Sequence, residues 1–184
     1  KKAPIPFTTS TLQQEASKTL NFSTQKTMRL AQQLYEGVDI KGRGTIGLIT
    51  YLRTDSTRIA AEADAAARSY IGDQFGASYV AEAPAAAKSD AKIQDAHEAI
   101  RPTDITLTPV QVKEQLSRDQ FRLYQLIWKR FTASCMADAK YNTMAVKIDG
   151  GGYRFTVSAS TVAFDGFMSV YVQDEEEKGG SMNL

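Results

Sequence analysis

The chain has 184 residues, of which 42% are hydrophobic and 23% are charged. These proportions are typical of a folded globular protein of about one domain or slightly more, and they exclude a chain that is disordered throughout. With 22 Lys and Arg against 21 Asp and Glu, the net charge is +1, which excludes a uniformly basic nucleic-acid coat but leaves room for a local basic patch. The single cysteine excludes an internal disulfide framework, and no apolar run reaches the roughly 18 residues of a membrane span.

The first residues are expected to be extended, because Pro4 and Pro6 disfavour a helix. The start lacks the apolar core of a signal peptide. Because the chain begins with Lys1 rather than Met and within a segment that resembles a strand, it is expected to be a piece of a longer protein. Helices are predicted for most of residues 10–139.

Capping residues mark the first helix boundaries. Ser10 with Gln13 has the pattern of a capping box, which predicts a helix from Ser10 to about Leu20. Ser23 is expected to cap a second helix that stops at Gly37.

The rest of the middle part contains one short strand and further helices. Residues 45–51 are β-branched and bounded by glycines, which predicts a strand. Ser56 is expected to cap an alanine-rich helix, and residues 76–96 are expected to form a long surface loop. The Thr-Pro pair at 108–109 is a helix start, and a helix over about 118–136 carries a core-facing stripe of aromatic and aliphatic side chains.

The last part of the chain alternates and is rich in glycine, valine and aromatic residues, which is typical of β structure. A hairpin is predicted from residues 144–148 and 153–157 around the turn 149–152, followed by a third strand over about 168–172. The acidic run 174–177 is expected to be a solvated tail. Because extended segments flank a helical middle, the two ends could pair in one β element, with the helical part inserted between them.

Tyr51 and Arg53 are the first candidates for chemistry. Residues two apart in an extended segment face the same way, so both side chains are expected to project together, just before the helix capped by Ser56. A tyrosine hydroxyl is a weak nucleophile at its ordinary pKa of about 10. A neighbouring guanidinium stabilises the phenolate and binds a phosphate through two hydrogen bonds, and a helix N-terminus adds donors toward an anion. This combination suits attack on a phosphodiester; the alternative is a buried Tyr51 beside an exposed Arg53.

His97 and Arg101 are a second, weaker candidate pair. They lie four residues apart and would share a face of a helical turn that ends before Pro102. Glu98 could raise the pKa of His97 and keep the ring cationic for contact with a phosphate. Residues 18–58 contain seven Lys and Arg against three Asp and Glu, which fits a polyanionic partner; the alternative is a helical surface of mixed charge.

Six segments of the chain form a recognisable series: PFTTSTLQQEA at 6–16, AQQLYE at 31–36, GLITYLRTDS at 47–56, HEAIRPT at 97–103, LIWKRF at 126–131 and FDGF at 164–167. In this order they resemble the central part of bacterial type IA DNA topoisomerase I. The resemblance covers nearly all of residues 4–172, and the segment around Tyr51 is its most specific part.

The resemblance implies a function for each matching residue. Tyr51 matches the active-site tyrosine, which cleaves single-stranded DNA through a 5′-phosphotyrosyl intermediate, so that another strand can pass before religation. The reaction relaxes negatively supercoiled DNA and needs no ATP. Arg53 matches the arginine that contacts the scissile phosphate, and His97 and Arg101 match positions near the DNA-binding cleft. Further DNA-binding candidates are Asp55, Ser56 and Arg58.

The resemblance also implies an α+β fold, in which a mainly helical domain with a winged-helix-like core is inserted into the β strap of a toroidal enzyme. Residues 1–10 are expected to be a strap strand. Residues 11–139 are expected to form the helical domain that carries the tyrosine, and residues 140–184 to form strap strands with an acidic tail.

Part of the family's active site is missing from this sequence. The family binds Mg²⁺ through an Asp-x-Asp-x-Glu cluster in an N-terminal Toprim domain, and no such cluster occurs here. The Mg²⁺ ligands are therefore expected outside this chain, with no metal bound within it, and the 184 residues alone are expected to be inactive in relaxation.

The expected partners are single-stranded or negatively supercoiled DNA and the missing Toprim and N-terminal domains of the same polypeptide. The expected location is the cytoplasm, at the bacterial nucleoid, and no membrane partner is expected. Two alternatives stay open. One is a non-catalytic DNA-binding module with a winged-helix-like core and a buried Tyr51, and the other is a purely structural clamp.

Overall fold

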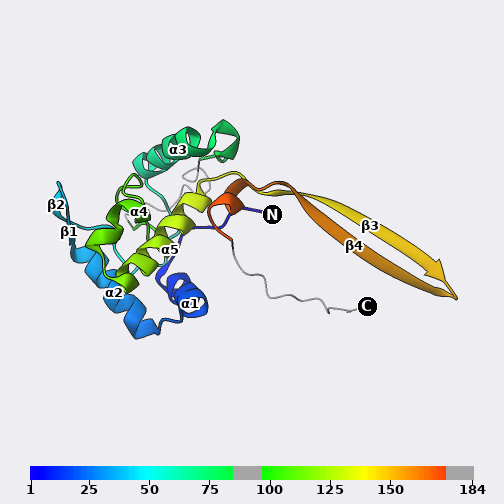
Figure 1. Ribbon diagram of the computed structural model, residues 1–184, viewed down its shortest axis with the longest axis horizontal. Coiled ribbons are helices and arrows are strands. Elements are labelled where there is room, and N and C mark those ends of the chain that lie inside the picture. Colours follow the sequence, from blue (N-terminus) through cyan, green and yellow to red (C-terminus); the bar gives the residue numbers. More distant parts are fainter. Residues whose placement is uncertain (85–96, 173–184) are drawn as a thin grey trace.

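The computed structural model describes residues 1–84 and 97–172, in which a helical body carries a long, projecting β-hairpin (Figure 1). The described helices are α1 (Thr9–Leu20), α2 (Thr24–Glu36), α3 (Ala61–Phe75), α4 (Pro109–Val112) and α5 (Arg118–Ser134), with 3₁₀ turns η1 (Ala77–Tyr79), η3 (Lys113–Gln115) and η4 (Gly166–Ser169). Two small antiparallel sheets pair β1 (Val38–Ile40) with β2 (Gly44–Ile46) and β3 (Lys140–Gly150) with β4 (Tyr153–Phe164). The prediction of a mixed α and β fold is confirmed.

The first helix begins at Thr9, and its cap is Thr8, two residues before the predicted Ser10. Thr8 is extended and its hydroxyl accepts the backbone N–H of Thr11, while the Thr11 hydroxyl accepts the backbone N–H of Thr8. This reciprocal pair is the capping box, so Ser10 already lies inside α1. The second helix is capped by Ser23 and ends at Gly37, as predicted.

Helix α5 carries the centre of the core. It begins with a capping box between Ser117 and Gln120, and its predicted stripe is confirmed, with Phe121 half-buried and the other members buried. Two of the buried rings also find hydrogen-bond acceptors: Tyr124 donates to the carbonyl of Leu107 at 2.6 Å and Trp128 to that of Ile105 at 2.9 Å. The Thr-Pro start of α4 is confirmed as well.

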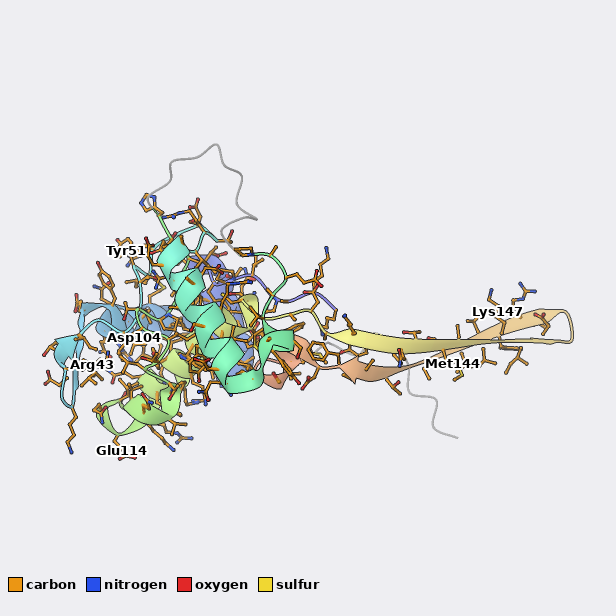
Figure 2. The ribbon with its side chains drawn as sticks, turned by 90° about the horizontal axis from the view of Figure 1, so that it is seen from above. Arg43, Tyr51, Asp104, Glu114, Met144 and Lys147 are labelled. Carbon is orange, nitrogen blue, oxygen red and sulfur yellow. The ribbon has the colours of Figure 1, made fainter. Side chains whose placement is uncertain are left out.

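The hairpin lies outside this core. All residues of β3 are exposed, as are all of β4 except its last, Phe164. In the register, Val146 faces Val157 and Ile148 faces Phe155, so alternate residues form an apolar side and a polar side. Figure 2 places Met144 and Lys147 on opposite sides of the ribbon.

The predicted third strand over 168–172 is wrong. The chain instead forms η4, because Gly166 adopts φ +51° directly beneath the entrance to β3. A Cβ at this position would lie 2.5 Å from the carbonyl oxygen of Ala137, so no other residue fits the turn without a shift of the backbone. Phe167 then donates its N–H to Ala137 at 2.9 Å, and Phe167 and Tyr171 are buried in the helical body.

The N-terminal segment passes the base of the hairpin without joining it as a strand. Among the described residues, neither sheet includes a residue from 1–10. Lys1 and Ala139 exchange two backbone hydrogen bonds of 2.7 and 2.9 Å, and Phe7 forms a single antiparallel bridge with Ile100. The expected backbone pairing of the two ends is thus limited to the hydrogen bonds between Lys1 and Ala139. The domain boundaries stay a prediction, and residues 85–96 of the predicted loop and the acidic run 174–177 lie outside the described residues.

Arg130 connects the N-terminal segment to the segment that follows the hairpin. Its guanidinium lies 4.6 Å from the ring centroid of Phe7 and 5.4 Å from that of Tyr171. It donates to the carbonyl of Ile5 at 2.5 Å and to the Tyr171 hydroxyl at 3.1 Å. The buried cation is therefore stabilised by two aromatic faces and two acceptors, and it holds the start and the end of the helical body together.

Candidate active site

The segment from Gly47 to Ser56 is a loop packed on the helical body, so the strand predicted over 45–51 is mostly wrong. Strand β2 ends at Ile46, and beyond it only Ile49 forms a bridge, to Pro102. The reason is a close approach to α2: Leu48 donates its N–H to the carbonyl of Leu34 at 2.8 Å. A Cβ on Gly47 would lie 2.6 Å from the carbonyl oxygen of Tyr35.

Because this segment is not a strand, the extended geometry behind the predicted common direction of Tyr51 and Arg53 is absent, and that direction stays a prediction. Leu52 is fully buried between them, while Tyr51 is 48% exposed and Arg53 is exposed. The Arg53 guanidinium has no hydrogen bond or ion pair with any residue in the described part of the chain. The loop therefore anchors itself through Leu52 and presents a tyrosine and a cation to solvent.

Hydrogen bonds fix the backbone on both sides of Tyr51. Thr50 donates its N–H to the carbonyl of Arg101 at 2.9 Å, and its hydroxyl donates to Ala99 at 2.7 Å. On the other side, the Thr9 hydroxyl donates to Leu52 at 2.7 Å and accepts the N–H of Thr54 at 2.8 Å. Tyr51 thus sits on a backbone tied to two other parts of the chain.

Ser56 does not cap a helix, which corrects the prediction of helix N-terminal donors beside Tyr51. Its hydroxyl accepts the N–H of Arg58 at 3.1 Å and donates to the carbonyl of His97 at 3.0 Å. Helix α3 begins five residues later, at Ala61. Ser56 and Arg58 instead connect the loop to His97, because Arg58 also donates to that carbonyl at 3.2 Å.

A shallow depression of about 250 Å³ surrounds Tyr51; it is lined by Tyr35, Thr50, Tyr51, Thr54, His97 and Glu98. The Tyr35 and Tyr51 rings meet edge to face, with centroids 5.4 Å apart, and Tyr51 lies on the helical body far from the hairpin (Figure 2). Arg53 is not among the lining residues. A larger cavity of about 950 Å³, which includes Tyr70 and Trp128, shares no residue with this site.

His97 and Arg101 do not share a helical face. Residues 97–99 have no regular structure, and Arg101 turns to Glu98 with hydrogen bonds of 2.9 and 3.1 Å. Burial opposes the ionisation of Glu98, but the bonds from Arg101 and from the N–H of Ala60 outweigh it and hold the pKa of Glu98 below its ordinary value. Glu98 thus forms an ion pair with Arg101, whereas His97 is exposed at the rim of the depression.

Sequence reasoning missed three contributors to the site. Tyr35 recurs at helical spacing with Ala31 and Leu34, and this spacing did not indicate that its side chain is 39% exposed. Thr50 carried no signal apart from its position before Tyr51, and Glu98 was considered only as a neighbour of His97. The remaining candidate, Asp55, is exposed on the same loop.

The described residues do not form a metal site. Within 1–84 and 97–172, no group of three or more His, Cys, Asp or Glu side chains could hold a metal ion, so the donor set that Mg²⁺ needs is not met there. No helix in the same part of the chain is long and apolar enough to cross a membrane.

Comparison with known proteins gives two consistent findings. The family described as DNA topoisomerase matches residues 1–183. A solved structure of full-length topoisomerase I from Thermotoga maritima is 43% identical in sequence and superposes with a TM-score of 0.81. The match covers 99% of this chain but only 29% of that one, so this chain spans less than a third of the length of that protein.

Proposed function

This chain belongs to the bacterial type IA DNA topoisomerase family, and from that premise we propose that it is the part of the enzyme that carries the nucleophile for DNA strand cleavage. In this proposal, Tyr51 is the nucleophile, and the remainder of the parent enzyme supplies the other half of the active site. The observation that carries the proposal is the exposed Tyr51 on a loop whose neighbours on both sides are tied down by hydrogen bonds.

The proposed reaction is a transesterification without net hydrolysis. The Tyr51 oxygen forms a bond to a backbone phosphorus of single-stranded DNA, and the bond from that phosphorus to the 3′ oxygen breaks. The tyrosine proton ends on the released 3′ hydroxyl, while the 5′ phosphate stays on the enzyme. The reverse step reseals the strand after another strand has passed, so the number of phosphoester bonds is conserved and ATP is not needed.

The cations near Tyr51 are proposed to bind the DNA backbone. Arg53 is the first candidate for the scissile phosphate, because its exposed guanidinium has no acceptor within the described residues and a bidentate fork suits a phosphate. His97 at the rim of the depression and Arg58 beside it are candidates for flanking phosphates. Asp55 and Ser56 are proposed only to belong to the same DNA-facing loop.

The proposal places the Mg²⁺ site in a Toprim domain outside this chain. The described residues lack a suitable ligand cluster, so none of the steps above is assigned to a metal. Because DNA is the proposed substrate, the enzyme is also proposed to act at the bacterial nucleoid. The alternative of a DNA-binding module without catalysis expects a buried Tyr51, and the 48% exposure of this side chain does not support it.

The test is Tyr51→Phe in the full-length parent enzyme. We expect wild-type enzyme to form a covalent adduct with an end-labelled single-stranded oligonucleotide, and Tyr51→Phe to form none while it binds the same oligonucleotide with similar affinity. The adduct is detected on a denaturing gel, and Tyr35→Phe is the matched control for loss of a nearby hydroxyl. Adducts that persist in the Tyr51→Phe enzyme would contradict the assignment.

A further inference from the structure

Arg101 is turned into the protein, and each of its three guanidinium nitrogens donates a hydrogen bond within the chain. Its side chain is only 12% exposed. Nε and Nη2 donate to the two carboxylate oxygens of Glu98 at 3.1 and 2.9 Å, and Nη1 donates to the carbonyl of Pro102 at 3.0 Å. A guanidinium that binds a phosphate needs its fork free, so this geometry points away from direct contact with DNA.

Glu98 links this pair to two other elements. Besides Arg101, it accepts the N–H of Ala60 at 2.7 Å, one residue before α3 begins. Its side chain is 20% exposed and forms part of the wall around Tyr51. The carboxylate therefore holds Arg101, the start of α3 and the edge of the depression in one arrangement.

The backbone of Arg101 is in turn locked to the residue before Tyr51. Arg101 donates its N–H to the Thr50 hydroxyl at 3.0 Å, and it accepts the N–H of Thr50 at 2.9 Å. A change in the side-chain pair is thus transmitted through one residue, Thr50, to the backbone of Tyr51. Loss of one partner would leave the other charge largely enclosed and unpaired, which forces local rearrangement.

We infer that Glu98 and Arg101 are positioning residues for Tyr51 and that neither contacts the DNA. This inference rests on the proposed function of Tyr51, and it departs from the expectation that Arg101 binds DNA. It assigns opposite roles to two nearby arginines: Arg53 faces the phosphate, and Arg101 holds the tyrosine loop. The reaction then depends on Arg101 through the placement of the nucleophile, because a misplaced attacking atom slows the chemical step far more than it weakens binding.

The first experiment separates binding from chemistry in the full-length parent enzyme. For Arg101→Met we expect the single-turnover cleavage rate of a single-stranded oligonucleotide to fall more than tenfold, with the dissociation constant within about twofold of wild type. The slope of log affinity against log salt should not change. For Arg53→Ala that slope should fall by about 0.7, the value for loss of one phosphate contact on a single strand. An equal fall in slope for Arg101→Met would overturn the inference.

The second experiment asks whether geometry or charge matters at this position. Arg101→Lys keeps the cation but cannot form the two-pronged bond to Glu98. If Arg101 positions Tyr51, cleavage should stay at least tenfold slow in Arg101→Lys, and Glu98→Gln should show a similar defect. The double variant Glu98→Gln/Arg101→Met should be no slower than the slower single variant, since the two residues act as a unit. Full cleavage by Arg101→Lys, or independent multiplication of the two defects, contradicts the inference.

Hydrogen exchange in the full-length enzyme distinguishes a local change in the Tyr51 loop from poor folding of the whole variant. We expect the Tyr51 loop to exchange faster in Glu98→Gln than in wild type, while α5 keeps its protection. Unchanged exchange in the loop counts against the inference. The proposed function has its own failure mode: if wild-type enzyme forms no adduct at Tyr51, that proposal falls, and the inference falls with it. If wild type and all pair variants cleave equally, only the inference falls.

Discussion

Tyr35 is an exposed aromatic residue whose proposed role follows from its position beside Tyr51. It lies on α2, 39% exposed, with its ring against Tyr51 and its edge in the same depression. Single-stranded nucleic acids are commonly held by bases stacked on exposed aromatic rings, and one stacked base contributes about 1–3 kcal/mol. We therefore expect Tyr35 to stack on a nucleotide next to the cleaved phosphate.

The corresponding prediction compares two substitutions at this position. Tyr35→Ala should weaken binding of a single-stranded oligonucleotide by about tenfold, whereas Tyr35→Phe, which keeps the ring, should stay within about twofold. An oligonucleotide with one abasic site at the stacked position should lose affinity for wild type but not for Tyr35→Ala. Fluorescence anisotropy measures all three. Equal losses for Phe and Ala would assign the effect to the hydroxyl instead of the ring.

Glu98 gives a prediction about pH. Its pKa in the folded protein lies below the ordinary value of 4.5, against the effect of burial, because of Arg101 and the N–H of Ala60. The ionised carboxylate therefore contributes stability that is fully present above about pH 4.5 and is lost as the pH falls through the lowered pKa. We expect the free energy of unfolding to fall less steeply below pH 4.5 in Glu98→Gln than in wild type. Urea titrations at several pH values test this, and parallel curves would contradict it. Among the described residues, the other carboxyls with lowered pKa are Asp104 and Asp119, and both are the same in the two proteins.

At the scale of elements, the β3–β4 hairpin is an exposed arm with one apolar side. Five apolar side chains on this side are 45–68% exposed; they are Met144, Val146, Ile148, Phe155 and Val157. The opposite side carries the hydrogen bond between Thr143 and Ser160 and the ion pair between Asp149 and Arg154. A two-stranded hairpin alone is only marginally stable in water, so this arm adds little to the stability of the helical body.

A matched pair of substitutions tests this description. Phe155→Lys and Thr156→Lys introduce the same charge at adjacent positions on opposite sides of β4. Because neither residue contacts the core, we expect both to leave the melting temperature of the 184-residue chain within about 2 °C. Only Phe155→Lys should reduce concentration-dependent association in sedimentation experiments, since it alone interrupts the apolar side. A large drop in melting temperature for Phe155→Lys would show that this side packs on the body.

The helices and loops also show which sequence patterns are sufficient to predict local structure. Helices α2 and α5 are periodic and well capped, so local sequence predicts both where they lie and which side is buried. The segment 45–51 is β-branched like a strand, but it packs on the carbonyl of Leu34 and on Pro102, which are distant in sequence. Ser56 has the chemistry of a cap, yet its hydroxyl is taken by His97 and Arg58. In both cases a tertiary contact outweighs a local preference, and the same contacts build the site around Tyr51.

At the scale of the whole molecule, the local basic excess is smaller than the sequence count suggests. Of the seven cations within residues 18–58, Lys26 forms an ion pair with Asp119 and Arg43 with Asp104, both at 2.7 Å. Figure 2 shows Arg43 and Asp104 near one another on the body. These acids come from outside the counted segment, so only the fold reveals that they neutralise part of it. Of the remaining cations, Arg53 is exposed on the same loop as Tyr51.

This distribution, together with the length of the match, leads to a prediction for the isolated chain. The chain corresponds to 29% of the Thermotoga topoisomerase I, and its described residues contain no metal-binding cluster. Within the described residues, Tyr51 lies in an open depression of about 250 Å³ that does not enclose a phosphate. Strong electrostatic stabilisation of a phosphoryl group requires an enclosed site with preorganised charges. In the proposed function, Tyr51 and Arg53 therefore require further groups from the rest of the parent enzyme to enclose the phosphate.

We therefore expect the purified 184-residue chain not to relax negatively supercoiled plasmid, with or without Mg²⁺. Its binding to a single-stranded oligonucleotide should be weak and should decline with added salt, because contacts between cations and phosphates release bound counterions. Agarose-gel relaxation assays and anisotropy titrations measure the two properties. Addition of the N-terminal part of the parent enzyme as a separate polypeptide should restore strand cleavage, and it should fail to do so with Tyr51→Phe. Relaxation by the chain alone would mean that its own residues suffice for catalysis, and that the cations around Tyr51 stabilise the reacting phosphate without an enclosing domain.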